Sequence, residues 1–259
     1  MIRGLYTSGW SMMANSKKMD VISNNLANVD TNAYKRDTVV FETFPEVLTK
    51  RVNDTKSALN PSGEVGNMQL GSDIGEIFTY YETGKSIETG RNLDMAVQNS
   101  GSAFFTVNVP DGNGNMKECY TRDGAFVIDS NNQLVTKEGY LVMGENGPIT
   151  LQGEDFSVKD DGTIIQNGEE VDKLAIKDFT DTTTLRKFGS NLVEKTDATE
   201  EQTFNGLIAQ GVLEGSNVNI VREMVDMITV MRSYEANQKL LQFQDNTLDK
   251  LVNQVGILR

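Results

Sequence analysis

Apolar residues recur at intervals of seven in both terminal segments of this chain. The first series consists of Leu5, Met12, Met19 and Leu26, with Ile22 and Val29 each three residues after a member. The second series consists of Ile220, Met227, Tyr234, Leu241, Leu248 and Val255. A sustained interval of seven is typical of an α-helix that packs along another helix. The sequence therefore predicts a helical seam at each end, and these residues are our candidate assembly interface.

Proline and glycine leave both ends free to form long helices. All four prolines lie between residues 45 and 148, and only Gly4, Gly9 and Gly256 interrupt the first 36 and the last 44 residues. Side chains suited to capping the second helix follow one another in Ser216, Asn217 and Asn219. Polar Asn237 and Gln244 occupy companion positions of the second seam, so a two-stranded coil alone would be poorly sealed. Packing of each helix on its own domain remains the alternative to helix-on-helix packing.

Residues 70–190 have a different pattern, in which short apolar runs alternate with turn signals. Phe104–Val107 and Ala125–Ile128 are each followed by a cluster of Asp, Asn, Ser or Gly, and later turns contain Gly162 and Asn167–Gly168. Short strands separated by such corners predict an antiparallel β-domain. The fold class expected is α+β, with a discontinuous coiled-coil-like unit flanking a central antiparallel β-domain. The predicted boundaries are 1–36 plus 215–259 for the helical assembly domain, 37–70 for a connector of mixed structure and 71–214 for the β-rich outer domain.

The charge is concentrated in the middle of the chain. The net charge is −13, of which residues 1–36 carry +3, residues 215–259 carry 0 and residues 37–214 carry −16. An acidic chain repels phosphate backbones, which argues against nucleic acid as a partner. The distribution fits an outer, solvated middle and near-neutral ends that become buried.

Several kinds of chemistry are excluded or unsupported. Histidine is absent, which removes the commonest general base and transition-metal ligand. Asp111–Asn115 imitates half of a calcium loop, but Met116 and Arg122 stand where glycine and glutamate are required. No nucleophile elbow, phosphate-binding loop or dinucleotide fingerprint occurs. We therefore assign no catalytic, cofactor or metal residue, and we expect a protein that is not an enzyme.

Membrane and export signals are also missing from the sequence. There is no apolar run of the ~18 residues needed to span a bilayer, so no membrane span is predicted. The first 20 residues lack the apolar stretch of a secretory signal, so export would use another route. The single cysteine, Cys119, cannot form an internal disulfide.

Motifs at both ends resemble one known family. Val21–Lys35, with Asn24, Asn25, Leu26, Ala27, Asn28, Tyr34 and Lys35, resembles the N-terminal signature of flagellar rod and hook proteins. Ser216, Asn217 and Asn219, followed by Arg232, Tyr234, Glu235 and Asn237, resemble their C-terminal signature. Gly101–Phe105 and Tyr120–Gly124 are similar to parts of the family's β-domain, so the resemblance covers nearly the whole chain.

The resemblance implies a structural subunit of the bacterial flagellar basal-body rod, in which terminal helices line a tube and the β-domain faces outward. It implies copies of itself, other flagellar rod and hook proteins and the flagellar export apparatus as partners, and it favours a distal rod position over a proximal one. A secreted adhesin with oligomerising helices and a wall-cleaving enzyme are the alternatives. The family commonly has glycine where this chain has Ala33, and because a positive φ strains alanine, we expect a different local turn there.

Overall fold

The computed structural model describes residues 2–50, 64–69, 71–110, 115–153, 155–189 and 191–255. The chain forms two compact units, each built from segments that are separated in the sequence. The first unit contains Met1–Asn24, Asp37–Phe78 and Val221–Arg259. The second unit contains Asn25–Arg36 and Thr79–Ile220.

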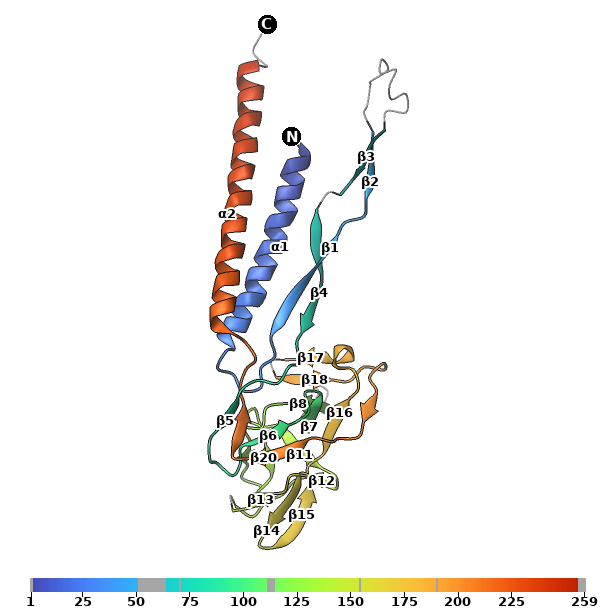
Figure 1. Ribbon diagram of the computed structural model, residues 1–259, viewed down its shortest axis with the longest axis vertical. Helices are drawn as coiled ribbons and strands as arrows, with labels where there is room; N and C mark the ends of the chain where they lie inside the picture. The colour runs from blue at the N-terminus through green and yellow to red at the C-terminus, as the bar shows by residue number, and fades with distance from the viewer. Residues whose placement is uncertain are drawn as a thin grey trace. The chain divides into compact units, whose positions relative to one another are not determined.

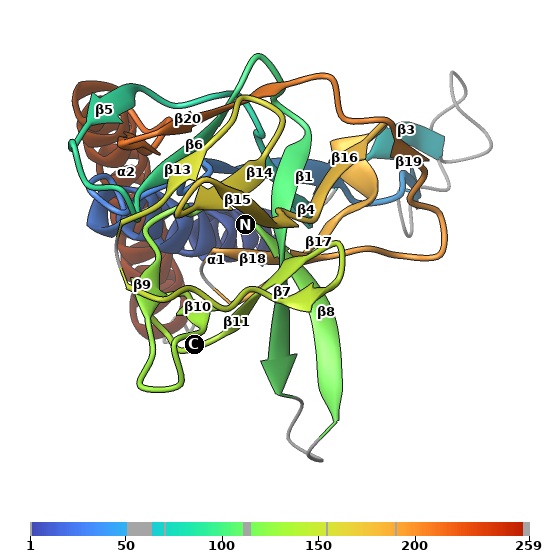
Figure 2. The ribbon, with the colours of Figure 1, turned by 90° about the horizontal axis from the view of Figure 1, so that it is seen from below.

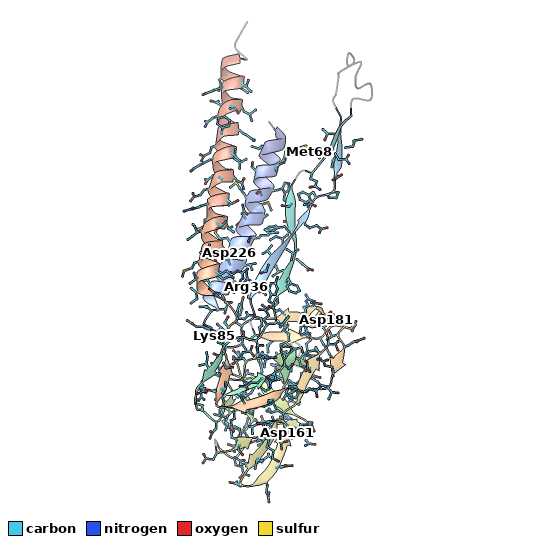
Figure 3. The ribbon with its side chains drawn as sticks, in the orientation of Figure 1. Arg36, Met68, Lys85, Asp161, Asp181 and Asp226 are labelled. Carbon is cyan, nitrogen blue, oxygen red and sulfur yellow. The ribbon has the colours of Figure 1, made fainter. Side chains whose placement is uncertain are left out.

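The first unit combines two long helices with a β-ribbon (Figure 1). Its helical elements are α1 (Ile2–Ala27), α2 (Ile220–Lys250) and the π-helical turn η2 (Leu251–Val255). Its strands are β1 (Asp37–Thr43), β2 (Val47–Lys50), β3 (Glu64–Met68) and β4 (Ser72–Thr79), where β1 pairs with β4 and β2 pairs with β3. In the β2–β3 pair Val47 lies opposite Met68, which Figure 3 labels. The described part of the predicted connector 37–70 is therefore strand except for residues 44–46 and 69, and residues 51–63 and 70 lie outside the described residues.

The second unit is built from short strands. They are β5 (Ser86–Glu88), β6 (Met95–Gln98), β7 (Ala103–Pro110), β8 (Met116–Thr121), β9 (Val127–Ile128), β10 (Leu134–Val135), β11 (Leu141–Gly144), β12 (Gly147–Pro148), β13 (Ser157–Val158), β14 (Thr163–Gln166), β15 (Glu169–Lys173), β16 (Ile176–Phe179), β17 (Arg186–Phe188), β18 (Leu192–Glu194), β19 (Glu201–Gln202), β20 (Leu207–Gln210) and β21 (Val212–Glu214). The 3-10 turn η1 (Thr182–Thr184) precedes β17.

The largest sheet of the second unit has the strand order β17-β18-β8-β7-β11-β10-β9, and β16 also pairs with β7. Figure 2 shows β7 and β8 side by side, and these strands pair antiparallel from Phe105–Thr121 to Pro110–Met116. Asn167 and Gly168 connect β14 to β15 and both have positive φ, 56° and 84°, as a two-residue hairpin of the predicted kind requires. The predicted loop residues 111–114 lie outside the described residues.

The core of the second unit follows the alternation of β7. Phe105 and Val107 are fully buried in the larger apolar cluster, where Phe105 meets Phe126 edge-on at 5.3 Å between ring centroids. Phe104 points to the opposite face and joins a smaller cluster with Tyr120 and other side chains. The α+β class and the antiparallel central region predicted from the sequence are confirmed.

The structure shows the backbone conformation of Ala33 and the burial of Cys119. The expectation that Ala33 would avoid a positive φ is wrong, because its φ is 56°. The turn persists because the Ala33 amide donates a hydrogen bond to the Glu214 carbonyl oxygen at 2.7 Å. Cys119 is fully buried, and burial raises the pKa of its thiol.

Candidate assembly interface and the signature segment

The two long helices meet through polar side chains. The contacting pairs are Asn15 Nδ2 with Ser233 Oγ at 3.1 Å, Asn237 Nδ2 with Ser11 Oγ at 3.1 Å, and Gly4 with Gln244. As the residue number rises along α1, that of its partner on α2 falls, so the helices are antiparallel. Gly4 makes room for Gln244, because a Cβ at this position would lie 2.5 Å from Gln244 Nε2. Two polar positions that weakened the predicted seam, Asn237 and Gln244, therefore meet small or polar partners within the chain.

The residues of the predicted seam differ in their exposure. The half-buried ones are Met12, Met19, Leu26, Val29, Met227, Tyr234, Leu241 and Leu248, and Ile22 is buried. Leu5 and Ile220 are exposed, at 38% and 41%. The side chain of Val255 lies outside the described residues. The role of this set in assembly stays a prediction.

A second apolar face of α2 was not recognised from the spacing. Val221, Met224, Val225, Ile228 and Met231 have between 45% and 72% of their surface exposed. Residues three, four and seven apart lie on one side of a helix, so these five form a continuous face, which we call the outer face of α2. The signal was present in the sequence, but a search for intervals of seven selects only one stripe.

The β-ribbon contacts α1 in the same unit. Trp10 packs edge-on against Phe44 at 4.9 Å between ring centroids, and Lys18 Nζ lies 5.7 Å from the centroid of the Phe41 ring. Lys17 forms a surface ion pair with Asp73 at 3.9 Å. Thus α1 has α2 on one side and the ribbon on the other, as Figure 1 shows.

Residues 25–36, which we call the signature segment, belong to the second unit and carry most of the N-terminal motif. Tyr34 and Asn25 are buried, and the Tyr34 hydroxyl donates to Asn25 Oδ1 at 3.2 Å. The Lys187 ammonium lies 4.9 Å from the centroid of the Tyr34 ring and donates to the Lys35 carbonyl oxygen at 3.2 Å. Asn191 Nδ2 donates to the Asn32 carbonyl oxygen at 3.3 Å.

The C-terminal motif meets this segment through Asn217. Its Oδ1 accepts a hydrogen bond from the Arg36 amide at 2.7 Å, and its Nδ2 donates to the carbonyl oxygen of Tyr80 at 2.8 Å. The Arg36 guanidinium also lies 5.9 Å from the centroid of the Tyr80 ring, and Figure 3 labels Arg36. Since α2 begins at Ile220, Asn219 occupies the position before the first helical residue.

The other motif residues lie at the surface or bind locally. Asn28 Oδ1 accepts from Thr31 Oγ1 at 3.1 Å, and Ser216 Oγ accepts from the Val218 amide at 3.2 Å. The exposed members are Asn24, Ala27, Asn219, Arg232 and Glu235, and the half-buried ones are Leu26, Tyr234 and Asn237. The structure thus brings the later part of the N-terminal signature and the first part of the C-terminal signature together in the second unit.

A buried charge cluster lies where the two signatures meet. Lys35 Nζ and Arg122 Nε each donate to the Glu214 carboxylate at 2.6 Å, one to each oxygen. The Gly84 amide adds a third hydrogen bond to Glu214 Oε1 at 2.8 Å. All three charged side chains are no more than 5% exposed. Charges buried in this way are tolerated only when paired and hydrogen-bonded, and here both conditions are met.

Arg122 anchors the cluster to the β-domain. Its guanidinium donates to the carbonyl oxygens of Ala103 at 2.6 Å and Val97 at 3.2 Å, and also to that of Ser100. Lys35 donates in addition to the Glu82 carbonyl oxygen at 2.7 Å. Arg122, which stands where a calcium loop would require glutamate, is therefore a structural cation.

The electrostatics of the cluster reflect two cations that share one carboxylate. Burial alone would raise the pKa of Glu214, but the charges of Arg122 and Lys35 and the hydrogen bonds hold it below its ordinary value. Burial, with repulsion from Arg122, lowers the pKa of Lys35, although the charge and hydrogen bond of Glu214 act to raise this pKa. The sequence did not single out Glu214, because a lone glutamate at the end of a short strand has no distinguishing pattern.

No chemistry beyond binding is indicated by these side chains. Among the described residues, no three His, Cys, Asp or Glu side chains gather as a metal site would require. In the same residues, neither long helix has the length of apolar sequence that crossing a membrane needs.

Three family descriptions match the chain in order. "Flagella basal body rod protein" matches residues 5–35, "Flagellar hook protein FlgE/F/G D1 domain" matches residues 99–166, and "Flagellar basal body rod FlgEFG protein C-terminal" matches residues 209–255. The first match contains the N-terminal motif up to Lys35, and the last contains Glu214 and Asn217.

Known proteins match over almost the entire chain. The flagellar basal-body rod protein FlgG of Buchnera aphidicola subsp. Baizongia pistaciae is 36% identical over 97% of this chain and 99% of its own length. FlgG of Bacillus subtilis is 34% identical over 98% of this chain and 99% of its own. The rod protein FlgF of Rhizobium meliloti is 30% identical over 98% of both. On this evidence the chain belongs to the flagellar basal-body rod protein family and is a structural subunit of the rod in the flagellar basal body.

Proposed function

We propose that this subunit forms the distal part of the rod, where it assembles with copies of itself into a helical tube that transmits torque from the motor to the hook. The relatives at 34% and 36% identity that support this position are both named FlgG. A proximal rod position is the alternative, and the chain is also similar to a basal-body rod protein named FlgF, at 30% identity. A basal body from cells that lack the chain distinguishes these positions, because loss of a distal subunit leaves the proximal rod in place.

The outer face of α2 is the observation that carries the proposal of self-assembly. Within the described residues of α2, only Glu223 and Val230 are buried, so most of its apolar surface is available to a neighbour. Burying one Val, Ile or Met side chain contributes ~1.5–3 kcal/mol, so five of them supply a substantial contact. An exposed apolar patch of this kind marks an interaction site in a soluble chain.

Assembly into a tube requires a contact between unlike faces. Such a contact, repeated from copy to copy, generates an open helical array instead of a closed ring. In this proposal, residues 1–36 and 215–259 form a coiled-coil-like assembly domain, 37–70 connect it, and 71–214 form the outer β-domain. The helices become fully ordered only when they dock on neighbours, including other rod and hook proteins, after passage through the flagellar export apparatus. The role is structural and includes no catalysis.

Substitutions on the outer face of α2 test the proposal. Val225→Asp and Ile228→Asp place a carboxylate where a neighbour would bury the side chain, and we expect neither variant to enter rods in cells that lack the wild-type chain. Gln152→Asp adds the same charge at an exposed polar position outside α2 and should assemble normally. Electron microscopy of purified basal bodies measures the outcome. Normal rods built from Val225→Asp would overturn the assignment of this face.

A further inference from the structure

The signature segment is held by Tyr80 and Glu82 and, to a greater extent, by residues from the second half of the chain. Its backbone accepts hydrogen bonds from Lys187 and Asn191, and its amides at Ala33 and Arg36 donate to Glu214 and Asn217. These partners lie on or next to β17, β18 and β21. The seat for residues 25–36 therefore exists only after the late strands of the second unit have formed.

Glu214 is central to this seat for reasons of charge. Its carboxylate is the counter-ion of both Lys35 and Arg122, and the three buried groups together carry one positive charge. Removal of the Glu214 charge leaves two buried cations that face each other. Removal of the Lys35 charge instead leaves Glu214 and Arg122 as a neutral pair. Glu214→Gln and Lys35→Met each keep the size of the side chain nearly unchanged. Loss of the Glu214 charge should nevertheless destabilise the cluster more than loss of the Lys35 charge.

The contacts of Glu214 also join three separate stretches of sequence. Its carbonyl oxygen accepts from the Ala33 amide, and its carboxylate binds Lys35, Arg122 and the Gly84 amide. Next to it, the Gly215 amide donates to the Lys85 carbonyl oxygen at 2.7 Å, and Figure 3 labels Lys85. Thus one residue of β21 fixes both the backbone and the side chains of the signature segment.

We propose that Glu214 is a latch that seats residues 25–36 on the second unit, so that the N-terminal signature is ordered in the single chain by the C-terminal strand β21. The signature segment differs in this respect from the outer face of α2, which needs a neighbour to become buried. The latch does not depend on the proposed distal position or on the mode of assembly, because all of its contacts lie within one chain.

Hydrogen exchange of the purified full-length monomer, followed by mass spectrometry, tests the latch. In Glu214→Gln we expect amides of residues 25–36 to exchange about 100-fold faster than in the wild type, because a buried pair that loses one partner opens readily. Amides of β7 should keep their protection. Lys35→Met should accelerate exchange of the segment much less. Glu170→Gln, which removes an exposed ion pair with Lys159, should leave the segment unchanged.

Three results would overturn the latch. One is that amides of residues 25–36 exchange at the wild-type rate in Glu214→Gln. Another is that these amides exchange equally fast in Lys35→Met and Glu214→Gln. The third is that amides of β7 exchange faster to the same extent as those of the segment, which would show that Glu214 stabilises the whole second unit. If Glu214→Gln does not fold, Glu214→Asp decides, because its shorter carboxylate should open the segment selectively. Exchange in Glu214→Asp identical to the wild type would then refute the proposal.

Discussion

The Ala33 amide donates its hydrogen to the carbonyl oxygen of Glu214, although these residues come from opposite ends of the sequence. The contact holds Ala33 in a left-handed backbone conformation, with φ at 56°. It also aligns Lys35 with the Glu214 carboxylate, so the backbone turn and the buried ion cluster are parts of one arrangement.

Replacing Ala33 with glycine should relieve strain. The left-handed conformation costs a non-glycine residue ~1–2 kcal/mol. Glycine removes this strain, but its greater freedom in the unfolded chain lowers the free energy of unfolding by ~0.4–1 kcal/mol. We expect Ala33→Gly to raise the free energy of unfolding by about 0.5–1 kcal/mol, measured by urea denaturation. Ala198→Gly is the control, since Ala198 lies in an exposed turn without positive φ and should lose stability. A loss of stability in Ala33→Gly would contradict the expectation that the backbone of Ala33 is strained.

Acid should weaken the second unit through Glu214. Its pKa is lowered in the folded chain, so its stabilisation is complete above the ordinary value of 4.5 and is lost as the pH falls through the lowered value. The difference in unfolding free energy between wild type and Glu214→Gln should therefore be largest near neutral pH and shrink below pH 4.5. The pKa of Lys35 is also lowered, but from an ordinary value of 10.5.

The matched control for the pH series is Glu170→Gln, whose exposed ion pair contributes little at any pH. Urea titrations of the three proteins across the acid range measure the effect. A difference between wild type and Glu214→Gln that stays constant with pH would show that the charge of Glu214 is not responsible.

Two glycines of α1 should respond differently to alanine. No atom lies within 4 Å of a Cβ placed at Gly9, so Gly9→Ala should favour the helix by ~0.5–1 kcal/mol. At Gly4 the new methyl group would meet Gln244 Nε2, so the gain in helix propensity is offset by displacement of that side chain. Helix content by circular dichroism should rise more in Gly9→Ala than in Gly4→Ala. Equal gains would mean that α1 and α2 do not meet at Gln244.

Truncation of the predicted seam tests its part in assembly. Leu26→Ala and Leu241→Ala each remove a half-buried side chain, a loss of ~2–5 kcal/mol once neighbours complete its burial. We expect both variants to be excluded from rods while the β-domain keeps its thermal unfolding transition. Microscopy of basal bodies and calorimetry of the monomer measure the two effects. Normal incorporation of both variants would remove these residues from the assembly interface.

Local patterns in the sequence were sufficient to predict the two terminal helices and a β-rich middle, but not the strands within residues 37–70. The intervals of seven and the confinement of proline to residues 45–148 indicate helices at both ends, because these features act within a few turns of one chain segment. Asn167–Gly168 indicates its hairpin for the same reason, since the turn needs two residues that accept positive φ.

What the sequence by itself determined was therefore the order of a helix, a β-rich middle and a second helix, and its motifs indicated the family. Only the tertiary structure decided that Lys35, Arg122 and Glu214 share one buried site, that Ala33 keeps a strained turn, and that α2 exposes a second apolar face. The physical reason is that these features depend on the burial and pairing of residues far apart in the chain. Neither spacing nor composition records which distant charge will accompany a buried one.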